Sequence, residues 1–481
     1  MICITVTPTS RKLAPADMLN ASRQCDIIEL CLDHFINEPN AGELIKMVDK
    51  PVMVSCRREQ DGGKWKGSET QRMQLLREAI VAGPAYVELD LDMAEKIPRF
   101  GNTKRVIAWT NLNRPLSKID EILAQCCKAK ADVVKFTCLT EDLDGAWPLL
   151  AAVTVPREVP IVGIGHGRSG VTFSLLGRKY GSPWIYAALE RGMEAFTGQA
   201  TVWQLNEDYR CSEINSKTRF VGIVGQGDGE NIAARVFNAA FSSMEKPIRC
   251  LPLLPGDLNK FPKILEKMKI NGLIVDPAYD GDLTSLAATR DELATVSNRI
   301  DVLKQESAGW KGVCTTFHAV DKAGVGVAGS PDWSSRGSVT VIGTSPMARG
   351  AAMYFSQKGA AVSIAGPSDN AAASVARAIG VRHVTWHAAQ DLRTDTLVLG
   401  DLGLTCGQAK GQVNAMIMRE RMTVVDLSVG LRGSTFAEEA HARGVRYIDP
   451  ASVFAVQLNL QFQQLTGREL PEDAFAKGLA E

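Results

Sequence analysis

The sequence predicts an α/β protein, in which a closed (β/α)8 (TIM) barrel precedes a two-part α/β module with a Rossmann-like domain. Short apolar, β-branched runs alternate with helical stretches along the chain, as in parallel sheets crossed over by helices. Eight such units fall within the first 200 residues, which is compact for a fold that usually takes about 250 residues. A buried strand followed by a glycine loop and a helix, residues 338–358, then indicates a doubly wound domain.

The barrel is predicted from eight β-rich runs, each followed by a crossover segment. Most are rich in Val, Ile and Leu, as buried parallel strands are. Barrel enzymes carry their chemistry at the carboxyl ends of the strands, so polar groups at those ends are the candidate site. The expected strands are Cys3–Thr7, Ile27–Leu32, Pro51–Cys56, Tyr86–Asp90, Arg105–Thr110, Asp132–Thr137, Pro160–Gly165 and Trp184–Leu189.

The rest of the chain continues the alternation after the polar segment Asn206–Thr218, which is the best candidate linker. Pro331–Gly337 is a second loop-like boundary. Strands are expected at Phe220–Gly225, Ile248–Leu253, Gly272–Val275, Ser338–Gly343, Ala361–Ala365, Thr396–Leu399, Thr423–Leu427 and Val445–Ile448. Helical or mixed stretches are expected at Asp257–Ile270, Leu283–Leu303, Met347–Lys358 and Ser452–Thr466.

The composition of the chain limits the kinds of molecule that it is expected to bind. The 481 residues hold 54 basic and 54 acidic side chains, which argues against a nucleic-acid or membrane-surface role. No run approaches the ~20 apolar residues that span a bilayer. The N-terminal residues predict a strand rather than a signal peptide, and the 11 scattered cysteines, without metal-ligand spacing, indicate reduced thiols in the cytoplasm. We therefore expect a small-molecule substrate and no metal, with a homo-oligomer left open.

Lys135 is the most informative single residue, because it lies in the apolar, β-branched run Ala131–Phe136. Burial disfavours the ammonium form of lysine, and a neutral amine attacks carbonyl groups. One interpretation is therefore a Schiff-base lysine. The alternative is a lysine at a strand end whose amine reaches water.

Other polar residues fall at the expected ends of the barrel strands. Together they form the pattern of a barrel active site, although each taken singly could be a solvated loop residue. They are Glu29, Cys31, Asp33, Arg57, Asp61, Asn111, His166 and Gln199.

Residues 1–205 resemble type I 3-dehydroquinate dehydratases in the motifs Ile28–Asp33, Arg57 with Gly62-Gly63, Asp132–Lys135 and Thr197–Gln199. The resemblance implies loss of water from dehydroquinate, a keto acid, through an imine on Lys135, with no cofactor. Glu29, Arg57 and Gln199 are then retained site residues. The family's catalytic histidine falls on Asn111, its carboxylate-binding arginine on Ser174, its strand-two arginine on Cys31 and its acidic residue before the two glycines on Asp61. Losing the general base implies a weakened or altered reaction.

His166 offers a replacement for the lost base, since it lies at the barrel mouth where the family usually has methionine. Arg168 or Arg178 could replace the lost carboxylate clamp. The competing interpretation is that His166 merely fills a loop of small residues.

The chain from about residue 219 resembles shikimate dehydrogenases, in a substrate domain, 219–330 completed by 450–481, and a Rossmann-like domain, 337–449. The resemblance implies substrate contacts at Asn238, Thr316 and Gln457. Asp228 and Glu230 fall where the family has serines that hold the substrate carboxylate, no lysine follows Val275, and the catalytic aspartate falls on Thr316. This half is therefore expected to be impaired.

The loop Gly343–Gly350 follows a strand and opens a helix, as a dinucleotide fingerprint does. NADP or NAD would contact Gly343, Ser345, Ala348 and Arg349, with phosphate on the free N–H groups of the helix start. Ser345 replaces the second glycine of the fingerprint, and Pro346, inside this loop, lacks an N–H group. A Rossmann-shaped domain without cofactor is the alternative.

Three hypotheses follow for the whole chain. The first is a lyase that forms an imine with dehydroquinate or a related keto acid. The second is a pseudoenzyme with a binding or regulatory role that keeps both folds, and the third is an imine-forming lyase with another small substrate. Retention of Lys135, Glu29 and Arg57 favours chemistry in the barrel.

Overall fold

The computed structural model describes residues 1–37, 39–225, 227–325, 333, 337–391, 393–401, 404, 413–428 and 435–479. The chain divides into two compact units. The first comprises Met1–Phe220 and Met244–Lys269, and the second comprises Val221–Ser243 and Ile270–Glu481. Within the described residues, none of the helices combines the length and the apolar character needed to cross a bilayer.

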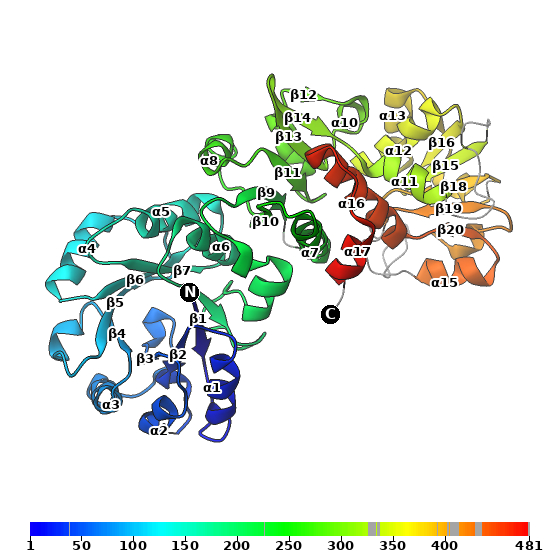
Figure 1. Ribbon diagram of the computed structural model, residues 1–481. Coiled ribbons are helices and arrows are strands. Elements are labelled where there is room, and N and C mark those ends of the chain that lie inside the picture. Colours follow the sequence, from blue (N-terminus) through cyan, green and yellow to red (C-terminus); the bar gives the residue numbers. More distant parts are fainter. Residues whose placement is uncertain are drawn as a thin grey trace. The chain divides into compact units, whose positions relative to one another are not determined.

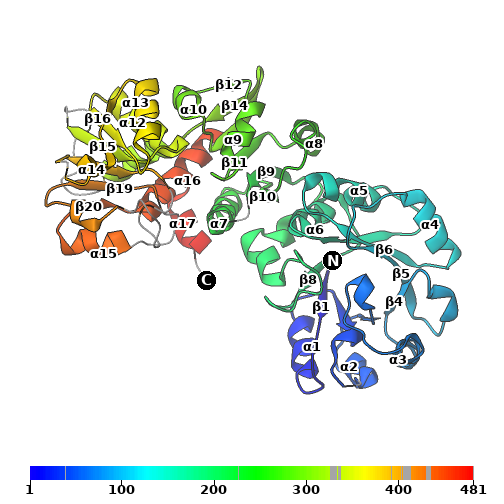
Figure 2. The same cartoon turned by 180° about the vertical axis from the view of Figure 1, so that it is seen from behind.

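The first unit contains a nearly closed parallel barrel, with strand order β7-β6-β5-β4-β3-β2-β1-β8 (Figure 1). Its two ends, β7 and β8, form the seam, and β8 lies beside β1, as the view from behind shows (Figure 2). This agrees with the predicted fold. The strands are β1 (Ile2–Val6), β2 (Ile27–Cys31), β3 (Val52–Ser55), β4 (Tyr86–Asp90), β5 (Lys104–Asn111), β6 (Val133–Leu139), β7 (Ile161–His166) and β8 (Ile185–Ala188).

Helices on the outside of the barrel follow the strands, and local capping fixes several of their ends (Figure 1). Ser68 and Gln71 form a capping box at the start of α3. Asp142 caps α5 through the Gly145 N–H, and Gly181, with φ 87°, ends α6 in the left-handed region that glycine favours. The helices are α1 (Ala14–Ser22), α2 (Ala41–Lys46), α3 (Glu69–Val81), α4 (Ile119–Lys128), α5 (Leu143–Thr154) and α6 (Gly170–Tyr180).

The segment Asn206–Thr218, expected to be a linker, ends just before the boundary between the two units at Phe220, and part of it is buried. It includes the end of the helical turn η4 (Gln204–Asp208) and all of η5 (Cys211–Glu213), and it buries Tyr209, Cys211 and Ile214. Apolar side chains spaced among polar ones hold it against the protein, which a count of polar residues does not reveal. The boundary expected at Pro331–Gly337 lies outside the described residues except for Trp333 and Gly337.

The second sheet is mixed, with the order β10-β9-β11-β13-β14-β12. Residues 283–303, expected to be helical or mixed, hold the short strand β12 and helix α10 and lead into an antiparallel hairpin of β13 and β14. Its elements are β9 (Arg219–Val224), α7 (Asp228–Ser243), β10 (Ile248–Leu253), α8 (Phe261–Met268), β11 (Gly272–Val275), α9 (Asp280–Leu283), β12 (Thr289–Arg290), α10 (Glu292–Ser297), β13 (Val302–Glu306), β14 (Gly309–Val313) and α11 (Thr316–Val325).

The third sheet is parallel and doubly wound, with the order β17-β16-β15-β18-β19-β20. The order reverses between β15 and β18, the place where open α/β sheets bind ligands. Its elements are β15 (Ser338–Ile342), α12 (Pro346–Gln357), β16 (Ala361–Ala365), α13 (Asp369–Ile379), β17 (Arg382–His383), α14 (Trp386–Ala389), β18 (Thr396–Leu399), β19 (Thr423–Asp426), α15 (Thr435–Ala442) and β20 (Arg446–Ile448), followed by α16 (Pro450–Thr466) and α17 (Glu472–Leu479).

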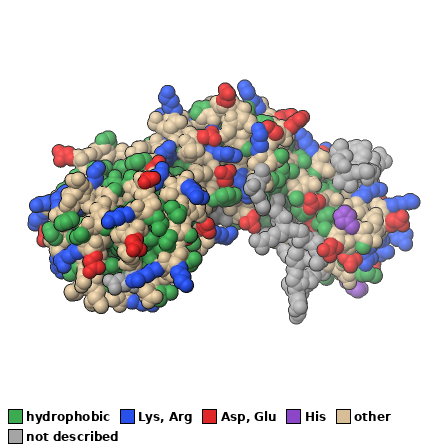
Figure 3. All heavy atoms as spheres, turned by 60° about the horizontal axis from the view of Figure 1, so that its bottom comes forward, with side chains coloured by type: hydrophobic (Ala, Val, Ile, Leu, Met, Phe, Trp, Pro, Cys, Tyr) green, Lys and Arg blue, Asp and Glu red, His purple; other side chains and the backbone are tan. Residues whose placement is uncertain are grey.

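Basic and acidic side chains are interspersed on the face of the molecule shown in Figure 3. They do not gather into one large patch of a single sign on that face. The 10 cysteines of the described residues are free thiols, and most are buried.

Candidate active site

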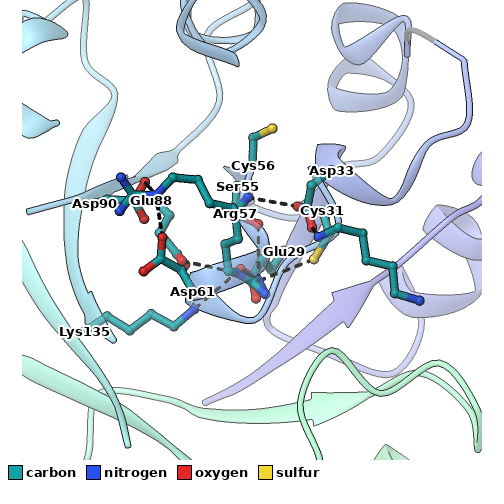
Figure 4. Close-up of polar contacts among 12 residues, drawn as sticks. Glu29, Cys31, Asp33, Ser55, Cys56, Arg57, Asp61, Glu88, Asp90 and Lys135 are labelled. Carbon is teal, nitrogen blue, oxygen red and sulfur yellow. Dashed lines mark hydrogen bonds and ion pairs between the residues drawn. The ribbon is translucent and has the colours of Figure 1, made fainter. Parts of the chain in front are cut away.

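Four charged side chains converge inside the barrel (Figure 4). Glu29 comes from β2, Arg57 follows β3, Glu88 comes from β4 and Lys135 from β6. Their relative exposures are 0%, 2%, 4% and 1%. Inside a barrel of parallel strands, one layer of side chains comes from alternate strands, as Glu29, Glu88 and Lys135 come from β2, β4 and β6.

The four side chains form a network with balanced charge. Lys135 Nζ donates to Glu88 Oε2 at 2.6 Å and lies 3.6 Å from Glu29 Oε1. Arg57 Nε donates to Glu88 Oε1 at 3.2 Å, and Arg57 Nη2 donates to Glu29 Oε1. Two cations thus face two carboxylates, which offsets the desolvation that burying any one of them alone would cost.

The two carboxyl groups differ in their electrostatics. Burial favours the neutral form of Glu29, but the cations of Arg57 and Lys135, helped by a hydrogen bond from Ser55, lower its pKa to about 2. Burial raises the pKa of Glu88, against the opposing effects of Lys135 and Arg57. Glu29 is therefore the fixed anion of the network, and Glu88 is the group better suited to accept a proton.

Two aromatic rings close the space around the lysine. The Tyr186 ring of β8 lies 4.7 Å from Lys135 Nζ, and the Phe196 ring lies 5.9 Å from it. Phe196 also lies 4.9 Å from Arg57 Cζ and packs against Gly62, where a Cβ would overlap the ring. The network is thus covered by Phe196 rather than open to solvent.

Glu29 Oε2 and Arg57 Nη1 lie in this interior without a hydrogen-bond partner in the described part of the chain. Buried polar groups are normally satisfied, so such atoms are the ones a polar ligand would engage. A hydroxylated, anionic small molecule offers both donors and acceptors for them.

His166 ends β7 beside the same aromatic cover. Its ring lies 6.4 Å from the Phe196 ring, and its buried Nδ1 has no hydrogen-bond partner among the described residues. Burial lowers the pKa of His166, although Glu141 opposes the shift. The imidazole is therefore neutral near pH 7 and able to accept a proton.

Other expected barrel residues have local roles. Asn111 accepts from the backbone N–H groups of Asn113 and Arg114 and so holds the turn after β5. Gln199 is buried and donates to Thr5 Oγ1 at 3.0 Å. Ser174 donates to the Gly170 carbonyl within α6.

The remaining barrel residues lie near the surface or by another cavity. Arg168 is exposed, and Arg178 is partly buried in the last turn of α6. Asp61 accepts from Arg58 Nε at 2.5 Å and lines a cavity of about 470 Å³ together with Asp90. The residues lining this cavity do not include the lysine network.

In the second unit, Thr316 and Gln457 meet at a residue that the sequence did not indicate. Gln457 Nε2 donates to Thr316 Oγ1 at 3.0 Å and to Asp301 Oδ2 at 3.1 Å, and Thr316 Oγ1 donates to the same oxygen at 2.9 Å. Burial raises the pKa of Asp301, against these hydrogen bonds. Asn238 is fully buried in α7.

The predicted cofactor residues lie in the loop from β15 to α12. Ser345 caps the helix by accepting from the Ala348 N–H at 3.2 Å, and Arg349 lies in its first turn with Nε lacking a partner in the described residues. The N–H groups of Thr344 and Ser345 donate to Asp401 at 2.8 and 2.9 Å. The loop as it stands therefore does not fit a pyrophosphate, because a carboxylate already uses these donors.

Sequence reasoning missed Glu88, Tyr186, Phe196, Asp301 and Asp401. Glu88 carried a usable signal, since it is an acidic residue within an apolar strand just as Lys135 is a basic one. The other four lie beside the site residues only because segments far apart in the sequence pack together in the fold.

The chain is an α/β protein that combines a (β/α)8 barrel, with a buried lysine–carboxylate network, and two further α/β sheets. Residues 2–216 match the type I 3-dehydroquinase family. The chain is 23% identical over 478 residues to the bifunctional 3-dehydroquinate dehydratase/shikimate dehydrogenase of Arabidopsis thaliana, covering 94% of this chain and 79% of the relative. It thus resembles a fusion of these two enzymes along most of its length.

Single-domain relatives and solved structures are also similar. A 3-dehydroquinate dehydratase of Dehalococcoides mccartyi is 29% identical over 226 residues, covering 45% of this chain and 98% of the relative. The dehydroquinate dehydratase and shikimate dehydrogenase structure of S. pombe AroM covers 100% of this chain and 98% of its own, with 14% identity and a TM-score of 0.46. The Arabidopsis relative is described as chloroplastic, so the cytoplasmic location stays a prediction.

Proposed function

We propose that the barrel forms an imine between Lys135 and the ketone of dehydroquinate or a closely related small keto acid. The observation that carries this proposal is the burial of Lys135 within the network of Glu29, Glu88 and Arg57. A lysine nucleophile needs a dry site and a nearby group that takes its proton. We further propose that the dehydration reaction is weakened or altered and that the dehydrogenase half is impaired.

The geometry suggests how the first step would proceed. Glu88 Oε2, 2.6 Å from Lys135 Nζ, accepts the proton that the ammonium must lose before it attacks. The amine adds to the ketone, and the carbonyl oxygen leaves as water when the C=N bond forms. Glu29 remains ionised and, with Arg57, holds the charge balance while the amine nitrogen becomes an iminium cation.

The second step needs a base for the proton next to the imine carbon. Asn111 cannot serve, because its amide group is neither a usable acid nor a usable base near neutral pH. His166 supports the proposal by its lowered pKa and its unpaired Nδ1. The imidazole would take the proton and return it to the departing hydroxyl group, which leaves as water. Hydrolysis of the imine then consumes one water and frees Lys135, so that the net loss is one water per turnover.

The C-terminal half is proposed to be impaired because acidic residues replace the serines that would hold the substrate carboxylate. Burial and the neighbouring Asp276 raise the pKa of Glu230 to about 7, so an acidic pair stands where an anionic substrate would bind. We retain the division into a barrel, 1–205, a substrate domain, 219–330 completed by 450–481, and a Rossmann-like domain, 337–449, as part of this proposal.

A non-catalytic role is the second candidate, favoured by the cover over Lys135. Phe196 packs on Arg57 and beside Lys135, and substrate reaches the amine only if this ring moves away. A protein in which the ring stays in place would keep the network as a structural element and act through binding or regulation.

Borohydride trapping separates the two candidates. The full chain is incubated with dehydroquinate and sodium borohydride and then analysed by intact mass and peptide mapping. We expect a reduced adduct on the peptide that carries Lys135. Lys135→Arg, which keeps the positive charge of the network but cannot form the imine, should lose the adduct, whereas Lys128→Arg on the exposed end of α4 should keep it.

The absence of an adduct with dehydroquinate and with other small keto acids would refute the enzymatic proposal and favour the non-catalytic one. An adduct that persists in Lys135→Arg would place the chemistry elsewhere. Turnover of dehydroquinate, followed by the absorbance of the conjugated product, then measures how much of the dehydration remains.

A further inference from the structure

The loop between β15 and α12 already holds an anion that belongs to the chain itself. The backbone N–H of Thr344 donates to Asp401 Oδ2 at 2.8 Å, and that of Ser345 donates to Asp401 Oδ1 at 2.9 Å. Each carboxylate oxygen thus takes one of two successive N–H groups. Gly343, with φ 131°, lies so close to Asp401 that a Cβ would overlap the carboxylate.

This position is where the phosphates of a dinucleotide would bind. The loop joins the first strand of a doubly wound sheet to the N-terminus of a 12-residue helix, and such helix starts attract anions through free N–H groups and the helix dipole. Asp401 comes from just beyond β18, the strand that pairs with β15 where the sheet order reverses. The carboxylate therefore occupies the crevice at the switch point.

The residue before Asp401 packs against the start of α12. Ser345 Oγ donates to the Gly400 carbonyl at 3.0 Å, and a Cβ on Gly400 would come within 2.7 Å of the Ala348 backbone. The strand end and the helix start are thus in direct contact immediately before Asp401.

We propose that Asp401 is a resident anion that fills the phosphate-binding loop and excludes the pyrophosphate of a dinucleotide. A ligand would have to displace the carboxylate from both N–H groups and then tolerate its negative charge nearby. The inference deepens the proposed impairment of the C-terminal half. It is tested by nucleotide binding, which does not depend on imine formation in the barrel.

The test is a titration of the full chain with NADP⁺, NAD⁺ and inorganic pyrophosphate by isothermal calorimetry. We expect no saturable binding by the natural sequence at submillimolar concentrations. Asp401→Asn keeps the size of the side chain and removes its charge, and Asp401→Ala also empties the loop. Binding of at least one of the three probes should tighten by about tenfold or more in both variants, because a like-charge contact is removed.

Asp391→Asn is the matched control, since it removes an exposed carboxylate from the same domain and should change nothing. Micromolar binding of NADP⁺ or NAD⁺ by the natural sequence would overturn the proposal. So would Asp401 variants that remain folded by circular dichroism and bind no better, because Asp401 would then be only a cap for α12. Should Asp401→Ala fail to fold, Asp401→Asn decides alone.

Discussion

Replacing Glu29 by Gln tests whether the buried network is held together by charge. Glu29 is fully buried, and its pKa falls from 4.5 to about 2, chiefly because the cations of Arg57 and Lys135 outweigh the effect of burial. At ~1.4 kcal/mol per pKa unit, that shift corresponds to about 3 kcal/mol of stability. Breaking a buried ion pair by removing one partner costs a similar ~3–5 kcal/mol. We therefore expect Glu29→Gln to destabilise the barrel by about 3 kcal/mol at pH 7.

The assay must report on the barrel separately from the rest of the chain. Hydrogen exchange of peptides from β2 and β6, followed by mass spectrometry, does so through the free energy of opening. Exchange in these peptides should become roughly a hundredfold faster in the variant. Glu121→Gln, which breaks an exposed ion pair with Lys118 at 3.6 Å, is the control and should have almost no effect.

The direction of the pKa shift of Glu29 determines how its contribution to stability changes with pH. The folded pKa of Glu29 lies below its unfolded value, so its stabilisation is complete above about pH 4.5 and is lost as the pH falls toward 2. The natural sequence and Glu29→Gln should therefore converge in stability at the acidic end of that window. A difference below about 1 kcal/mol at pH 7, or one that does not change with pH, would refute the reasoning.

Three further predictions concern the cover, the base and the acidic pair. Phe196→Ala should expose Lys135 and speed its borohydride trapping, whereas an unchanged rate would show that the ring does not control access. His166→Ala should abolish turnover while leaving imine formation, measured by absorbance and by trapping, and unchanged turnover would discard its role as the base. The folded pKa of Glu230, about 7, lies above its unfolded value, so the stability contributed by its protonated form is present below about pH 4.5 and lost as the pH rises through 7. Asp276→Asn should flatten this dependence in exchange of α7 peptides, and a profile identical to that of the natural sequence would contradict the assignment.

Much of the barrel could be predicted because its strands are buried on both faces. The run Val133–Phe136 is apolar except for Lys135, and its counterparts are mostly apolar too, a pattern that is typical of parallel strands covered by helices. The packed turns after β8 were not predicted, since isolated apolar residues in a polar segment do not show what they pack against. The hairpin of β13 and β14 was also missed, because neither five-residue strand, Val302–Glu306 or Gly309–Val313, shows the regular alternation of apolar and polar residues that indicates a strand.

The sequence by itself determined the order of the strands and the presence of a lysine inside one of them. Alternation of side chains along a strand is a local property, and it shows which residues share a face with Lys135 without any knowledge of the partners. Only the tertiary structure decided that Lys135 meets Glu88, 47 residues away, and that Asp401 reaches Thr344, 57 residues away. Those pairs depend on which strands become neighbours when the sheets form, and long-range pairing is set by the packing of the whole domain rather than by any local run of residues.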